Sequence, residues 1–187
     1  MAFKDLVCEE VSCEHLIRDQ WIDLRRSAYR FPDGRVFEPY YTYSRRDYVV
    51  IVASDEAGNY LCVHQFRPGI RQVTTEFPAG GIERKDGETC TPEQALAAAK
   101  RELREETGCE ADRWSHLLTV PSQATLSDNY AWIFRAEGCR PVVSQKLDEM
   151  ELLETEKYTA AEIEEMIASG RFQQVVHITA WLLACRR

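Results

Sequence analysis

The stretch Thr91–Cys109, TPEQALAAAKRELREETGC, decides the fold of this 187-residue chain. It predicts a helix with both of its ends marked. Thr91 stands at the N-cap, Pro92 is tolerated at the first helical position, and Gln94 completes the spacing of a capping box. Gly108 follows the last turn, where glycine adopts the left-handed C′ conformation at the lowest cost. We therefore expect the helix to begin after Thr91 and to end before Gly108.

One face of this predicted helix is apolar. Its small and aliphatic residues recur at helical spacing, at Ala95, Leu96, Ala99 and Leu103. Such a stripe is typical of a helix that packs on a hydrophobic core. We therefore expect the helix to be docked on a core.

The other face is acidic. Glu102, Glu105 and Glu106 stand at i, i+3 and i+4, so their carboxylates share one patch of the helix. Like charges at this spacing cost a few tenths of a kcal/mol per pair, and Arg101 offsets this by pairing with Glu105. Clustered carboxylates are hard oxygen ligands for Mg²⁺ or Mn²⁺. An acidic run taken alone is more often a solvated face, so its surroundings decide between the two.

Composition restricts the class of protein. The length suits one domain with a small appended subdomain. The formal net charge of −8 offers no basic surface for nucleic acid or an anionic membrane. No apolar run reaches membrane-spanning length, and the N-terminal MAFKDLVCEE lacks a signal-peptide core. Seven cysteines without a CxxC pair predict reduced thiols and a cytoplasmic protein.

Short strands surround the predicted helix. His15–Arg30 is predicted as one extended stretch that ends at the turn Pro32-Asp33-Gly34. Further strands are predicted at Val36–Tyr43, Tyr48–Ala53, Tyr60–Phe66, Leu117–Val120 and Ala131–Ala136, with helices from Thr159 to Gly170 and from Val176 to Cys185. This order favours an α/β protein, a mixed α/β/α sandwich preceded by an antiparallel β subdomain. We place the subdomain at residues 1–46 and the main domain at residues 47–187.

The spacing around the acidic run resembles the Nudix box. Gly87, Glu93, the run Arg101-Glu102-Leu103, the pair Glu105-Glu106 and Gly108 fill its fixed positions, and Cys109 replaces the usual aliphatic residue. The chain is thus identified as similar to the Nudix hydrolases. This resemblance implies an α/β/α sandwich, Mg²⁺ or Mn²⁺ held by Glu102, Glu105 and Glu106, and catalytic roles for Arg101 and Glu105.

Two shorter segments resemble the ADP-ribose pyrophosphatase branch of that family. They are Gln65-Phe66-Arg67-Pro68 and Glu76-Phe77-Pro78-Ala79-Gly80. The resemblance implies that Arg67 contacts the pyrophosphate, with Glu76 on the substrate side, and that the backbone carbonyl of Ala79 completes the metal site. The glycine-rich segment is also one whose backbone can approach a ligand closely.

The glutamate that precedes the box helix has two candidates. The residue spacing of the box selects Gly87 and Glu93. The local sequence pattern instead selects Gly80 or Gly81 with Glu88, followed by an inserted loop. Both alternatives leave the three helix glutamates unchanged.

The resemblance also assigns the acidic stretch Leu147–Glu151. At the matching place, relatives carry a loop with the general base and a further metal-associated glutamate. We assign Glu149 as the base and Glu151 as the metal ligand, and the reverse order fits equally. Proton transfer to a carboxylate and charge neutralisation by metal are the chemistry that diphosphate hydrolysis needs.

Substrate residues are implied by the same resemblance. Trp21, Phe37 and Glu38 fall where relatives contact adenine, across a two-fold homodimer built from the N-terminal sheet. For an aromatic residue on a strand, core packing is the alternative. Relatives also have Ser-Pro-Gly in the loop after the box, where this chain reads Gln123-Ala124-Thr125-Leu126-Ser127-Asp128.

The expected activity is Mg²⁺-dependent hydrolysis of a nucleoside diphosphate sugar, with ADP-ribose favoured. The missing Pro-Gly leaves GDP-mannose and other nucleotide sugars open. A Nudix-fold sensor that binds nucleotides without turnover is the alternative of another class. A sensor does not need all three carboxylates. Because Glu102, Glu105 and Glu106 are all present, the sequence favours an enzyme over a sensor.

Overall fold

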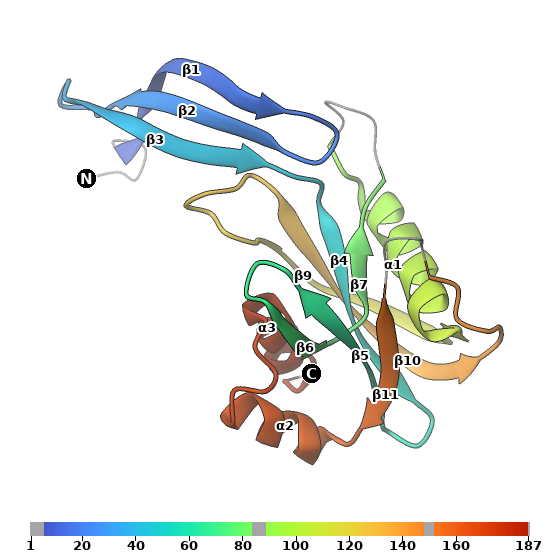
Figure 1. Ribbon diagram of the computed structural model, residues 1–187. Helices are drawn as coiled ribbons and strands as arrows, with labels where there is room; N and C mark the ends of the chain where they lie inside the picture. The colour runs from blue at the N-terminus through green and yellow to red at the C-terminus, as the bar shows by residue number, and fades with distance from the viewer. Residues whose placement is uncertain (1–5, 84–88, 148–151, 187) are drawn as a thin grey trace. The chain divides into compact units, whose positions relative to one another are not determined.

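The computed structural model describes residues 6–83, 89–147 and 152–186 (Figure 1). Within it the chain forms two compact units. The first contains Met1–Arg46 and Pro121–Tyr130, and the second contains Asp47–Val120 and Ala131–Arg187.

The first unit is a three-stranded antiparallel sheet in the order β1-β2-β3. Its strands are β1 (Glu9–Arg18), β2 (Asp23–Arg30) and β3 (Val36–Ser44). The prediction of one stretch from His15 to Arg30 is wrong, because a turn separates β1 from β2. In that turn the Asp19 carboxylate accepts hydrogen bonds from the backbone N–H groups of Trp21 (2.7 Å) and Ile22 (2.9 Å). An Asp side chain thus closes a turn that contains neither glycine nor proline.

A distant loop completes the first unit. The hydroxyl of Tyr40 donates to the Thr125 carbonyl at 2.8 Å, and the N–H of Tyr43 donates to the Leu126 carbonyl at 2.8 Å. Arg25 pairs with Asp128 at 3.0 Å. The compact unit therefore extends beyond residues 1–46, the boundary that the sequence predicts for the subdomain.

The second unit is built on a mixed sheet. Its strands are β4 (Tyr48–Asp55), β5 (Tyr60–Arg67), β6 (Gln72–Glu76), β7 (Ala79–Gly81), β8 (Cys109–Glu110), β9 (Arg113–Pro121), β10 (Tyr130–Pro141) and β11 (Leu153–Tyr158). The order is β11-β5-β4-β10-β8, with β6 on β5, β7 on β4 and β9 on β10. β4 pairs with β10 in parallel orientation and with β5 in antiparallel orientation. The strands predicted inside β4, β5, β9 and β10 are confirmed, whereas β6, β7, β8 and β11 were not predicted.

Helices cover both faces of this sheet. They are α1 (Pro92–Thr107), α2 (Ala160–Ala168) and α3 (Val175–Ala184). Alternate residues of β4 serve different cores: Val49 and Ile51 pack in the cluster that contains α1, and Val50 and Val52 in the cluster that contains α2 and α3. Figure 1 shows α1 on one side of the strands and α2 and α3 on the other. The predicted α/β/α sandwich is confirmed.

The helix ends agree with the sequence. Thr91 Oγ1 accepts the N–H of Gln94, and Gln94 Oε1 accepts the N–H of Thr91, which is a capping box. Gly108 is left-handed, with φ 69°. Thr159 and Glu162 form the second capping box, and Gly170, with φ 73°, follows α2.

Two further findings concern the whole chain. All seven cysteines lie in the described part, and each is a free thiol. None of the helices in the described ranges is both long and apolar enough to cross a bilayer.

Candidate active site

The acidic face of α1 is buried where it meets the sheet. Glu102 is 5% exposed and Glu106 is 2% exposed, whereas Glu105 is partly exposed. Leu103 and the alanines of the same helix fill the core beside them. Two carboxylates buried in this way need polar partners, because an isolated buried charge is costly. The simple interpretation of a solvated acidic surface is therefore wrong for Glu102 and Glu106.

The backbone of β7 packs against the two buried carboxylates. The N–H of Ala79 donates to Glu106 Oε2 at 3.0 Å. Gly80 lies against the carboxylate of Glu102, since a Cβ on Gly80 would stand 2.0 Å from Glu102 Cδ. The close approach expected of the glycine-rich segment is thus made to a carboxylate of α1. Only glycine fits at this position unless Glu102 moves.

Arg101 balances the charge on the outer side of the patch. Its guanidinium donates to Glu105 Oε2 at 2.6 Å, to Glu102 Oε1 at 2.7 Å and to the Gly81 carbonyl at 3.0 Å. Burial lowers the pKa of Arg101, but the two carboxylates outweigh burial and raise it. The predicted pairing of Arg101 with Glu105 is confirmed. The same side chain also links α1 to the end of β7.

Arg67 and Glu76 form a second charged group beside the carboxylates. Arg67 Nε donates to Glu76 Oε1 at 2.9 Å and Nη2 donates to Oε2 at 2.6 Å, which is a bidentate pair. Glu76 is completely buried. Burial lowers the pKa of Arg67, but Glu76 and the nearby charge of Glu106 outweigh it and raise the pKa. Arg67 therefore lies within electrostatic reach of the α1 carboxylates.

Two residues of this group were missed by sequence reasoning. His177 lies with its Nε2 3.5 Å from Glu76 Oε2, and Gln174 donates to Glu76 Oε1 at 3.3 Å. Both belong to the start of α3, about a hundred residues from Glu76. The available signal was a single histidine in an otherwise apolar helix. That signal alone does not tell which group the histidine faces.

The carboxylates suit a divalent metal by their chemistry. Three glutamate side chains and a backbone carbonyl are the hard oxygen donors that Mg²⁺ binds. In the described residues, which omit 84–88 and 148–151, no three histidine, cysteine or acidic side chains come together in a ready metal-binding cluster. Arg101 and the Ala79 amide hold the carboxylates in their present positions. By chemical type these oxygen donors suit Mg²⁺, and in this structure Arg101 pairs with two of the three carboxylates.

Several predicted residues cannot be placed in this site. Glu149 and Glu151 lie outside the described residues, and so do Gly87 and Glu88. Glu93 is described, and it is exposed in the first turn of α1. The choice between Glu88 and Glu93 therefore stays open.

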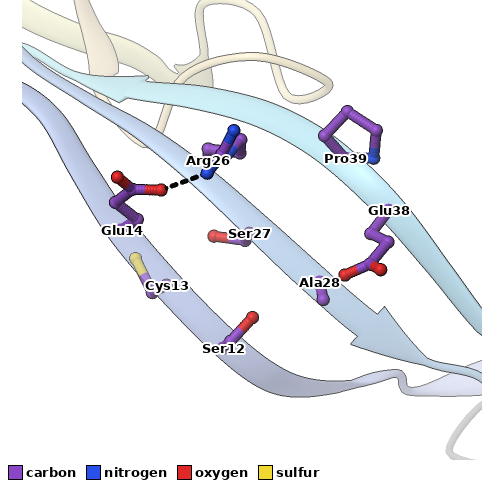
Figure 2. A pocket seen from close by; sticks show the side chains of 8 residues that line it. All are labelled: Ser12, Cys13, Glu14, Arg26, Ser27, Ala28, Glu38 and Pro39. Carbon is purple, nitrogen blue, oxygen red and sulfur yellow. Dashed lines mark hydrogen bonds and ion pairs between the residues drawn. The ribbon is translucent and has the colours of Figure 1, made fainter.

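The residues predicted to contact a nucleobase lie in the first unit. Trp21 is 63% exposed in the turn after β1, so core packing does not explain it. Phe37 stacks on Tyr29, with ring centroids 5.6 Å apart. Glu38 follows Phe37 on β3 and lines a hollow of about 560 Å³ with residues of β1 and β2, among them Glu14 and Arg26 (Figure 2). Phe37 also contacts Tyr40 edge-on, and the pairing of β2 with β3 is irregular between these two aromatic residues.

Comparison with known proteins agrees with this architecture. The model of the NUDIX domain matches residues 44–175. An ADP-ribose pyrophosphatase of Mycobacterium tuberculosis is 31% identical over 134 residues, which cover 72% of this chain and 61% of that protein. The ADP-ribose pyrophosphatase of Bacillus subtilis is 27% identical over 167 residues, which cover 89% of this chain and 86% of that protein.

A solved structure shares the fold. It is described as an ADP compounds hydrolase, and it superposes with a TM-score of 0.77 at 20% identity, covering 96% of this chain and 92% of that chain. The family match extends from the end of β3 to the first residue of α3, so it includes α1, β7 and the Arg67–Glu76 pair. By this match and by the carboxylates that α1 buries against β7, the chain belongs to the Nudix family.

Proposed function

We propose that this protein hydrolyses the pyrophosphate bond of a nucleoside diphosphate sugar in a Mg²⁺-dependent reaction. ADP-ribose is the favoured substrate, and the products are then AMP and ribose 5-phosphate. The two relatives named above are ADP-ribose pyrophosphatases, which supports this choice. GDP-mannose is the nearest rival substrate.

A single observation carries the proposal. Two buried carboxylates of α1, Glu102 and Glu106, lie against the backbone of β7, and Arg67 lies within reach of the charge of Glu106. These contacts support a site in which acidic groups suited to metal lie within electrostatic reach of a cation suited to phosphate. A diphosphate needs both, since its charge must be neutralised and its position fixed before water attacks.

The residues have separate roles in this proposal. Glu102, Glu105, Glu106 and the Ala79 carbonyl would hold Mg²⁺, which when bound neutralises the charge that develops on the phosphate oxygens. Arg67 binds a diphosphate oxygen through its guanidinium. Glu149 takes a proton from the attacking water as the P–O bond to the leaving phosphate breaks, and Glu151 assists the metal. No covalent intermediate is required.

The first unit supplies the nucleobase site in this proposal. Trp21 stacks on the base, with Phe37 and Glu38 as the further contacts. We also propose that the protein is a homodimer through its N-terminal sheet. The seven free thiols support the cytoplasm as its compartment.

A substrate panel tests the activity. ADP-ribose and GDP-mannose are incubated with the purified protein and Mg²⁺, and AMP or GMP release is measured. Glu106→Gln keeps the shape of the side chain and removes its charge. We expect a loss of turnover of at least about 100-fold, because changes to residues that only orient a metal ligand already cost about 10–100-fold.

Glu164→Gln on α2 is the matched control, since it removes the same charge from an exposed position. It is expected to keep wild-type turnover. The melting temperature of Glu106→Gln in metal-free buffer is expected to hold or rise, because one charge leaves an acidic face. Wild-type turnover in Glu106→Gln at saturating Mg²⁺ would contradict the metal site. Binding of ADP-ribose without AMP release would favour the sensor.

A further inference from the structure

The start of α3 buries a histidine beside the Arg67–Glu76 pair. His177 is 3% exposed, and its ring lies nearly parallel to that of Phe77, with the centroids 6.4 Å apart. The N–H of Phe77 donates to Nδ1 at 3.1 Å. Because Nδ1 accepts this hydrogen bond, the proton of the neutral ring is on Nε2. Nε2 lies 3.5 Å from Glu76 Oε2, a polar contact that is longer than an ordinary hydrogen bond.

The Glu76 carboxylate is surrounded by donors. Arg67 contacts both of its oxygens, and Thr74 Oγ1 and Gln174 Nε2 donate to Oε1. Among the described residues of α3, His177 is the one whose side chain contacts Oε2. A completely buried carboxylate with several partners has little freedom to rotate. Besides Arg67 on β5, the partners that set its orientation come from β6 and from the start of α3.

The orientation of Glu76 controls that of Arg67. The guanidinium is planar, and two of its five N–H groups are held by Glu76, so its plane is fixed. The Arg67 side chain is 35% exposed and lies near Glu106. A fixed, half-exposed guanidinium is prepared to meet an anionic group with little loss of entropy.

We propose that His177 is a positioning residue, which acts through Glu76 to hold Arg67 in the orientation that binds the diphosphate of the substrate. This inference rests on the proposed function, and it adds a residue of α3 to the binding machinery. The neutral ring is essential to this role, because Nδ1 must accept from Phe77 while Nε2 faces Glu76. Burial lowers the pKa of His177 to about 4, so the ring is neutral at pH 7.

Two substitutions separate the two contacts of the ring. Asn places its carboxamide oxygen near the position of Nδ1, so His177→Asn keeps the acceptor for Phe77 and loses the donor to Glu76. Gln is one methylene longer, so His177→Gln keeps the donor to Glu76 and loses the acceptor for Phe77. Both variants shrink a buried ring, and both are expected to lower the melting temperature.

Their kinetics are expected to differ. We expect His177→Asn to raise the KM for ADP-ribose severalfold, up to about tenfold, with a smaller effect on kcat, since the polar contact between Nε2 and the Glu76 carboxylate is lost. His177→Gln is expected to stay within about threefold of the wild-type KM, because the donor is kept. A purely structural histidine predicts the same KM for both variants at a temperature where both are folded. Equal KM values would overturn the proposal.

Gln174→Met provides a second variant in case the buried substitutions fail to fold. Gln174 is only half-buried, and it donates to the other oxygen of Glu76. If Glu76 positions Arg67, this variant also raises KM without a large change in melting temperature. Wild-type KM in Gln174→Met and in His177→Asn would contradict the chain of contacts.

A readout without substrate separates this proposal from the proposed function. In a ¹⁵N spectrum of arginine side chains, Arg67 Nε–H is assigned as the signal that Arg67→Lys removes. We expect this signal to be protected from exchange in wild type and His177→Gln, and to broaden in His177→Asn. If no nucleotide sugar is cleaved, the proposed function fails and this spectrum still decides the role of His177. An unchanged Arg67 signal in His177→Asn would overturn that role.

Discussion

At the scale of single residues, exposure separates two kinds of aromatic side chain. Phe77 is completely buried and packs against Phe172 and Trp181, so it belongs to the core. Trp21 is 63% exposed, and its backbone is held by Asp19 whatever its side chain does. Trp21 therefore makes no contribution to a core comparable to that of Phe77, and its ring is accessible to a ligand.

Trp21→Ala tests whether that ligand is the nucleobase. We expect the KM for ADP-ribose to rise, because stacking of a base on an aromatic ring contributes about 1–3 kcal/mol. The kcat is expected to stay unchanged, since the base binds alike in the ground and transition states. Steady-state kinetics and a melting curve on the same sample provide both numbers.

The melting temperature distinguishes a binding role from a structural one. Removing a buried tryptophan costs about 3–5 kcal/mol of stability, whereas Trp21→Ala is expected to change the melting temperature little. Trp21→Phe keeps an aromatic face and serves as the control. An unchanged KM in Trp21→Ala would remove Trp21 from the nucleobase site and leave Phe37 and Glu38.

At the scale of elements, the end of α1 is fixed by contacts with a later segment. The Gly108 carbonyl accepts hydrogen bonds from the N–H groups of Val142 (2.9 Å) and Val143 (3.2 Å). The N–H of Lys146 donates to the Glu105 carbonyl at 2.9 Å. The segment that leads to Glu149 and Glu151 is therefore anchored on the helix that carries Glu102, Glu105 and Glu106.

Gly108→Ala tests this junction. A Cβ on Gly108 would lie 2.3 Å from the Val143 carbonyl oxygen, and the backbone has φ 69°. Gly170→Ala is the matched control, because Gly170 has φ 73° and no atom within 4 Å of its added Cβ. Left-handed strain alone costs about 1–3 kcal/mol. We expect Gly108→Ala to destabilise the protein by more than Gly170→Ala, measured as the free energy of unfolding in urea.

The activity of Gly108→Ala adds a second readout. Because the clash displaces the segment that leads to Glu149 and Glu151, turnover is expected to fall in this variant and to hold in Gly170→Ala. Equal losses of unfolding free energy in the two variants would show that the Val143 carbonyl moves away from the added Cβ without destabilising the protein.

At the scale of the whole molecule, the boundary between the units is discontinuous in the sequence. Residues 121–130 are hydrogen-bonded to β3 through Tyr40 and Tyr43, and they pair with Arg25 of β2. A chain that begins at residue 47 keeps the sandwich and loses these partners. The predicted domain of residues 47–187 is therefore expected to contain an unsupported loop.

Limited proteolysis with chymotrypsin measures this effect. We expect the chain of residues 47–187 to be cut after Leu126 or Tyr130 much faster than the full chain, because backbone freed from its hydrogen bonds enters a protease site readily. The control is the full chain under the same conditions, in which the Leu126 carbonyl accepts the N–H of Tyr43. Equal rates of cleavage would mean that the loop holds its conformation without β3.

The sequence by itself determined features that depend on nearby residues. Thr91 with Gln94 and Thr159 with Glu162 mark helix starts, and Gly108 marks a helix end, because capping is a local hydrogen-bond problem. The strands at β4 and β5 were readable from their β-branched runs. The family resemblance could likewise be recognised from the spacing of the Nudix box, because most of its residues lie within one helix.

Only the tertiary structure decided which groups meet. β6 and β7 are short and lack an apolar pattern of their own, so their pairing with β5 and β4 makes them strands. The sequence predicted that Glu102 and Glu106 share one helix face, and the packing of β7 against that face buries both side chains. His177 faces Glu76 only because α3 returns to the sheet a hundred residues later. Contacts of this range depend on packing over the whole domain, which local residue patterns do not encode.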